Sequence, residues 1–164
     1  MGVKARHVVA NYLKIAGSEG TKAYERLTMG FSELNESFSP VVSSKRYIHQ
    51  KAATSNITSY EWQSDFTADV IESEAAIKAI QKIAQEELVG EDCLFDYCIV
   101  DTEAAGTTDG TYQARERKVA IVVDELNDED GELQFTGSFR GVTDWVKGEF
   151  NPTTKTFTEA TATA

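Results

Sequence analysis

An unusually long alternation of apolar and polar side chains runs through residues 57–70. One set of alternate positions is mainly apolar and contains Tyr60, Trp62, Phe66 and Ala68. The positions between them are acidic or hydrogen-bonding: Glu61, Gln63, Asp65, Thr67 and Asp69. Because successive side chains of a strand point to opposite faces of a sheet, this pattern predicts one long β-strand with a buried face and a polar face.

From Ser73 onward the apolar period changes to that of an α-helix. The apolar stripe consists of Ala76, Ile77, Ile80, Ile83, Ala84 and Leu88. Ser73 is predicted to cap the amino end, and Gly90 is predicted to end the helix in the left-handed conformation. The sequence therefore predicts one amphipathic helix that docks a single face on a sheet.

The rest of the chain has mainly the pattern of strands and turns. Further strands are expected at residues 45–51, 94–101, 114–125, 132–140, 145–150 and 155–158, with turns at residues 53–56, 127–131 and 151–154. Longer connections are expected at residues 29–44 and 102–113. The first is too apolar to be a solvent-exposed loop that contacts nothing. Consecutive strands joined by tight turns pair antiparallel.

These elements predict a mainly β fold in a single domain over residues 1–164. We expect an antiparallel two-sheet sandwich or barrel, flanked by one α-helix that covers an open side. Residues 1–20 are expected to form an extended N-terminal segment, and residues 159–164 a C-terminal tail.

The composition excludes several classes of protein. The formal net charge is -11, and the sequence pI is about 4.6. Tight sequence-independent binding of nucleic acid needs clustered cations, so this charge argues against it. The sequence has neither a signal-peptide core nor a transmembrane segment, which predicts synthesis and assembly in the cytoplasm.

The sequence predicts no catalytic, cofactor or metal site. His7 and His49 have no nearby partner for a nucleophile triad, and no recognised hydrolase motif accompanies them. Cys93 and Cys98 lie on opposite faces of one expected strand and are predicted to be free, reduced core residues, an intermolecular bridge being the alternative. We therefore expect a protein that is not an enzyme.

The acidic loop at residues 127–131 matches a calcium loop only in part. Leu126 would occupy the first ligand position and Gly137 the twelfth, where an acidic residue is required. We expect a hairpin turn here, with weak calcium binding as the alternative.

Several local patterns, in their order along the chain, carry a family resemblance. They are YIHQK (47–51), TSNITSYE (54–61), AAIK (75–78), AR (114–115) and VKGEFNPTTKTFT (146–158). Together they resemble the major tail proteins, or tail tube proteins, of long-tailed bacteriophages over residues 23–159. The resemblance implies a virion protein of the phage tail whose copies form hexameric rings. The rings stack into a hollow tube through which DNA passes.

The resemblance also implies partners and positions for side chains. The expected partners are identical subunits, a tape measure protein and tail terminator or distal tail proteins, with transient passage of DNA and no membrane. A lumen that lets a polyanion slide should be acidic and polar, which makes Glu61, Gln63, Asp65, Thr67 and Asp69 the lumen candidates; an outward solvated face is the alternative. The candidates for a subunit or ring interface are Phe31, Phe38, Val41 and Val42. We expect neighbouring subunits to order the two terminal segments.

Two other functions stay open at the level of sequence. One is a monomeric β-barrel that binds a small apolar ligand, which would need a consistently apolar interior. The other is the tube subunit of a contractile, phage-like injection device.

Overall fold

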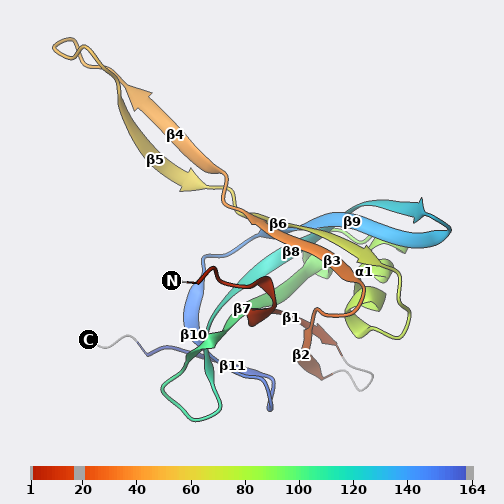
Figure 1. Ribbon diagram of the computed structural model, residues 1–164. Coiled ribbons are helices and arrows are strands. Elements are labelled where there is room, and N and C mark those ends of the chain that lie inside the picture. Colours follow the sequence, from red (N-terminus) through yellow and green to blue (C-terminus); the bar gives the residue numbers. More distant parts are fainter. Residues whose placement is uncertain (1, 17–20, 162–164) are drawn as a thin grey trace.

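The computed structural model describes residues 2–16 and 21–161 (Figure 1). The strands are β1 (Val9–Ala16), β2 (Lys22–Arg26), β3 (Phe31–Ser37), β4 (Pro40–Lys45), β5 (Thr54–Tyr60), β6 (Gln63–Asp69), β7 (Leu94–Ala105), β8 (Tyr112–Glu129), β9 (Glu132–Gly141), β10 (Val146–Asn151) and β11 (Thr156–Glu159). The helix α1 spans Ala75–Gln85, and two 3-10 turns span Arg6–Val8 and Gly90–Cys93. The mainly β fold with one α-helix is confirmed.

Most strands belong to one nine-stranded antiparallel sheet. Its order is β2-β1-β7-β8-β9-β6-β3, and β10 pairs with β8 and with β11. Strand β8 is 18 residues long, so its first part pairs with β7 and β10, and its later part pairs with β9. The two layers predicted from the sequence are therefore continuous through β8.

The main core lies between the curved sheet and helix α1. Its largest fully buried side chains include Phe66, Tyr97, Phe135 and Phe139, and Phe66 stacks on Phe139 with a ring-centroid distance of 4.9 Å. The helix contributes Ala76, Ile77, Ile80 and Ile83, as its apolar stripe predicted. Burial of these side chains is the main stabilising contribution of the helix.

The ends of α1 differ from the prediction. Glu74, not Ser73, occupies the N-cap position, and no side chain caps the helix there. At the other end Glu87 has a positive φ of 51°, and the Leu88 N–H donates to the Ile83 carbonyl at 3.1 Å. This is a Schellman-type ending, so the left-handed residue that ends the helix is Glu87, and Gly90, which is also left-handed, begins the next 3-10 turn.

The N-terminal segment is built into the fold. Strand β1 pairs with β2 on one side and β7 on the other. Its side chains are buried on both faces: Leu13 and Ile15 belong to the main core, while Ala10 and Tyr12 belong to a second cluster. The expectation of an extended segment over residues 1–20 is therefore wrong for residues 9–16, and residues 17–20 lie outside the described part.

The second cluster lies on the opposite face of the sheet, under the β10–β11 hairpin. It contains Tyr24, Cys98 and Phe150, and the Tyr12 and Phe150 rings lie 4.3 Å apart. Cys93 and Cys98 are free and buried, as predicted, although Cys93 lies in a 3-10 turn and not in a strand. Burial raises the pKa of the Cys98 thiol, which keeps it protonated.

Strands β4 and β5 form a separate two-stranded sheet that projects from the body as an arm (Figure 1). This arrangement corrects four expectations. Residues 46–53 are the arm tip instead of a strand, and residues 54–56 begin β5 instead of forming a turn. The alternating run 57–70 is divided between β5 and β6, and residues 29–44 form most of β3 and β4.

The two predicted hairpin turns are confirmed. Asp130 and Gly131 have positive φ angles at the β8–β9 turn, and Asn151 accepts hydrogen bonds from the Thr153 and Thr154 amides before β11. The connection expected at residues 102–113 is shorter, because β7 continues to residue 105 and β8 begins at residue 112.

Candidate assembly surface

The arm has no hydrophobic face against its own body. Every residue of β4 and β5 is exposed. Val42 and Ile57 are cross-strand partners, yet their exposed fractions are 55% and 52%. An isolated two-stranded hairpin is marginally stable in water, so an arm of this kind is suited to rest on another surface.

The two chains at the root of the arm lie side by side. The Glu61 N–H donates to the Ser39 carbonyl at 3.1 Å, which closes the arm where it joins the body. Residues 40–60 are therefore an excursion that leaves the body and returns to the same point.

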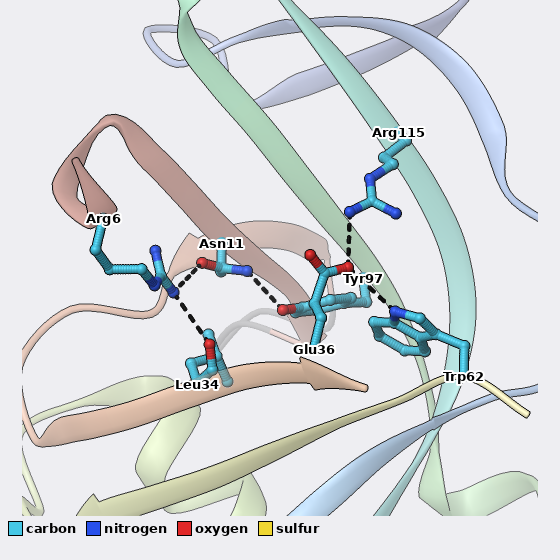
Figure 2. A network of polar contacts seen from close by, with 7 residues as sticks. All are labelled: Arg6, Asn11, Leu34, Glu36, Trp62, Tyr97 and Arg115. Carbon is cyan, nitrogen blue, oxygen red and sulfur yellow. Dashed lines mark hydrogen bonds and ion pairs between the residues drawn. The ribbon is translucent and has the colours of Figure 1, made fainter. Parts of the chain in front are cut away.

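A polar network fixes strand β3, which leads into the arm, to the body (Figure 2). One oxygen of the Glu36 carboxylate accepts from the Arg115 guanidinium at 2.6 Å and from the Trp62 indole N–H at 3.1 Å. In the same network, Arg6 donates to the Asn11 side chain at 2.8 Å and to the Leu34 carbonyl at 3.5 Å. These contacts bridge β3 to β1 and β8, with which it does not pair.

Aromatic and guanidinium groups pack beside this network. The Arg117 guanidinium lies 5.0 Å from the Trp62 ring centroid and 4.9 Å from that of Trp145, and the two indoles meet edge to face. Burial lowers the pKa of Arg117, and its Nε donates to the Thr143 carbonyl at 2.9 Å. The chain is thus held firmly at Trp62, where the arm ends and β6 begins.

Four of the five lumen candidates share the outer face of β6. Gln63, Asp65, Thr67 and Asp69 alternate with the buried residues of this strand, whereas Glu61 lies in the break before it. Strand pairing places further polar residues on the same face, namely Glu33, Asn35 and Ser37 of β3 and Gln134, Thr136, Ser138 and Arg140 of β9. The result is a continuous polar face with acidic residues on β3 and β6.

Neighbouring amides engage the carboxylates of this polar face. Gln63 donates to Asp65 at 3.0 Å, and Gln134 donates to Asp69 at 3.1 Å. Sequence reasoning missed the β3 and β9 residues because only the strand order brings them beside β6.

The interface candidates occupy two different environments. Phe38, Val41 and Val42 are exposed, at 51%, 39% and 55%. Phe31 instead packs on its own core, with its ring centroid 6.2 Å from that of Phe66. Four further exposed apolar side chains of the arm were not among the interface candidates: Tyr47, Ile48, Ile57 and Tyr60.

The two histidines lie far apart in the chain. His49 stacks beside Tyr47 at the arm tip, and His7 lies in the first 3-10 turn. Within residues 2–16 and 21–161, no group of three or more His, Cys, Asp or Glu side chains could hold a metal ion. In the same ranges, no helix is both long enough and apolar enough to cross a bilayer.

Comparisons with known proteins give the fold a context. No family model matches the sequence, and the curated proteins give no match. Among solved structures, the chain is similar to one from the tail of an empty GTA particle refined with helical averaging and C6 symmetry. The TM-score is 0.56 at 10% identity, over 87% of this chain and 97% of that chain. The chain has a phage-tail-type fold.

The chain is also similar in fold to a second solved structure. It is a chain of the anti-feeding prophage baseplate, 6-fold symmetrised, with a TM-score of 0.50 at 12% identity over 90% of this chain and 97% of that chain. The space between the curved sheet and α1 is filled by aromatic side chains, including Phe66, Tyr97 and Phe139. A filled interior does not fit the alternative of a barrel that encloses a small apolar ligand.

Proposed function

We propose that this protein is a structural tail tube subunit of a phage-like particle. Its copies form hexameric rings, and the rings stack into a hollow tube through which DNA is delivered. The observation that carries this proposal is the arm, a two-stranded sheet whose strands are wholly exposed and which carries apolar side chains. An element of this kind gains its stability by lying on neighbouring copies.

The comparisons support the six-fold arrangement. Both similar structures come from assemblies with six-fold symmetry, and both matches cover nearly the whole of the other chain. In such a ring the polar face of β6 would line the bore, with Gln63, Asp65, Thr67 and Asp69 toward the DNA. Carboxylates and amides repel or slide past phosphate, which suits passage without retention.

The proposal gives the protein no reaction to catalyse. It places the protein in the virion tail after assembly in the host cytoplasm, with a tape measure protein and tail terminator or distal tail proteins as partners. Phe38, Val41 and Val42 are the side chains proposed to be covered by neighbouring copies.

One variant tests the proposal directly. Because Ser39 and Glu61 are hydrogen-bonded, a short Gly-Ser linker can replace residues 40–60 without disturbing the body. We expect the full chain to form rings or tubes with six-fold symmetry by negative-stain electron microscopy. The variant without the arm should give the circular dichroism spectrum of a folded β protein but stay monomeric by sedimentation velocity. A full chain that remains monomeric at high concentration, even with its tail partners, would contradict the proposal.

The second candidate is a tube subunit of a contractile injection device, which the similarity to the anti-feeding prophage baseplate chain favours. Binding of a contractile sheath protein to assembled tubes distinguishes the two. The tube of a non-contractile tail should not bind a contractile sheath protein.

A further inference from the structure

The arm has a charge opposite to that of the rest of the molecule. Residues 40–60 contain three basic residues, Lys45, Arg46 and Lys51, and none of the 27 acidic residues of the chain. All three basic side chains lie at or near the tip, beside the exposed Tyr47 and Ile48, whose exposed fractions are 56% and 108%. The arm tip therefore combines positive charge with apolar surface.

A second hairpin of the molecule has the complementary character. The end of the β8–β9 hairpin carries the exposed aliphatic residues Leu126 and Leu133, at 48% and 54% exposure. Leu126 is paired with Phe135, and Leu133 precedes Phe135 by two residues, so the two leucines share one face of the hairpin. They form an apolar patch that the main core does not cover.

Acidic side chains lie on both faces of this hairpin end: Asp128, the ladder partner of Leu133, shares the face of the leucines, and Glu129 and Glu132 lie on the other face. Residues 124–132 contain no basic residue, and their acidic side chains are exposed: Asp124, Glu125, Asp128, Glu129, Asp130 and Glu132. Glu129 and Glu132 are directly opposite each other in the β-ladder, where like charges are destabilising. A cationic partner at this position would relieve that repulsion.

The two hairpins of one copy cannot meet. In Figure 1 the arm leaves the body on one side, and the β8–β9 hairpin ends on the opposite side. Complementary surfaces at opposite ends of a molecule make a head-to-tail contact between copies, which leads to closed rings or to stacks that grow along an axis.

We propose that the arm tip of one copy docks on the β8–β9 hairpin end of the next copy. Tyr47 and Ile48 lie on Leu126 and Leu133, while the long side chains of Arg46 and Lys51 reach around the hairpin end to Glu129 and Glu132 on its other face. This inference rests on the proposed function and deepens it, because it names the surface that receives the arm. Opposite charges around an apolar centre give the contact its direction and suppress arm-to-arm contacts.

Charge exchange provides the first test. The arm variant R46E/K51E and the hairpin variant E129K/E132K should each lose tubes, with a rise of roughly tenfold or more in the concentration needed for assembly, because like charges then face each other. The chain that carries all four changes should assemble again. The control K78E/K82E makes the same charge change as the arm variant on exposed positions of α1 and should assemble as the unchanged chain does.

Disulfide trapping provides a second, independent test. Copies carrying Ile48→Cys are mixed with copies carrying Leu133→Cys and oxidised, and a disulfide-linked dimer is expected. The native Cys93 and Cys98 are buried, and pairing Ile48→Cys with a cysteine at the exposed Val89 is the control that should give no dimer.

The outcomes separate the two proposals. Tubes of the unchanged chain together with unaffected assembly in both charge variants would overturn the docking contact and leave the tube function standing. A chain that forms neither tubes nor the trapped dimer would overturn both. Loss of DNA binding instead of assembly in the arm variant would assign the arm to nucleic acid and overturn the docking contact.

Discussion

The carboxylate of Glu36 lies 2.6 Å from the guanidinium of Arg115, and this ion pair joins strand β3, at the root of the arm, to strand β8 of the body. The same carboxylate oxygen accepts the Trp62 indole N–H. We expect Glu36→Ala to lower the free energy of unfolding by about 1–2 kcal/mol, because two donors lose their acceptor in a site that is only partly exposed. Urea unfolding followed by tryptophan fluorescence measures this change. Glu33→Gln, at an exposed carboxylate on the same strand, is the control and should change stability by less than about 0.5 kcal/mol.

Close packing at Gly137 gives a second prediction. A Cβ at this position would lie 2.1 Å from the Val122 carbonyl oxygen and 2.9 Å from Phe66. Backbone and an aromatic core cannot both move aside, so Gly137→Ala should destabilise the fold by about 1–3 kcal/mol. Thermal unfolding with matched denaturant curves measures it. The neighbouring Ser138→Ala is the control, since within the described residues its buried hydroxyl has no hydrogen-bond partner and its loss should cost nothing.

The loop between β7 and β8 should respond to acid through Glu149. This carboxylate accepts from the Thr107 N–H at 2.5 Å and from the Thr107 hydroxyl at 2.6 Å, and these hydrogen bonds hold its pKa below the ordinary value of 4.5. A lowered folded pKa means that the stabilisation is fully present above pH 4.5 and is lost as the pH falls through the folded value. The protection of the Thr107 amide against exchange, measured relative to its intrinsic rate at each pH, should therefore fall in acid. Glu149→Gln should show faster exchange at neutral pH and a weaker acid response, whereas Glu72→Gln, the same change on an exposed side chain, should match the unchanged chain.

The polar face of β6 gives a prediction about DNA. If it lines the bore, tubes of an Asp65→Lys/Asp69→Lys chain should retain double-stranded DNA when they are pelleted, whereas unchanged tubes should release it. Retention should weaken with salt, with a slope in log affinity of about 0.9 for each phosphate neutralised. Glu72→Lys/Glu91→Lys, on exposed positions outside this face, is the control. Equal retention by both variants would place the polar face outside the bore.

The sequence predicted the body of the fold better than its extension. The helix stripe was predictable because α1 has one buried and one exposed face, and the strands around Tyr97, Ile121 and Phe139 were predictable from their alternating apolar residues. Strand β7 is nevertheless buried on both faces at residues 97–100. The arm was not, because all its residues are exposed and its alternation therefore reports no burial. The pattern of residues 57–70 also ran without interruption across the break at Glu61 and Trp62, where the chain passes from one sheet to another.

Strand β1 was not predicted from the sequence, and the physical reason is the opposite one. It is covered on both faces, so it has no alternation, and its polar residue Asn11 suggests a loop. In the structure Asn11 is buried and donates to the Tyr97 hydroxyl at 2.6 Å. A buried amide with paired partners cannot be told from an exposed one by residue type alone. Which surfaces of the polar face and the arm meet other molecules depends on the assembly, about which a single sequence carries only charge and exposure.

The closure of the arm root at Ser39 and Glu61 has a kinetic consequence. A hairpin that touches nothing of its own body can fray in a free subunit, and each copy then loses conformational entropy only when it is captured. The first few copies meet this cost without a prepared surface, while later copies add to an end that already presents one. We expect slow nucleation of free subunits, followed by rapid elongation once a seed exists. The seed would then determine where and when a tube grows.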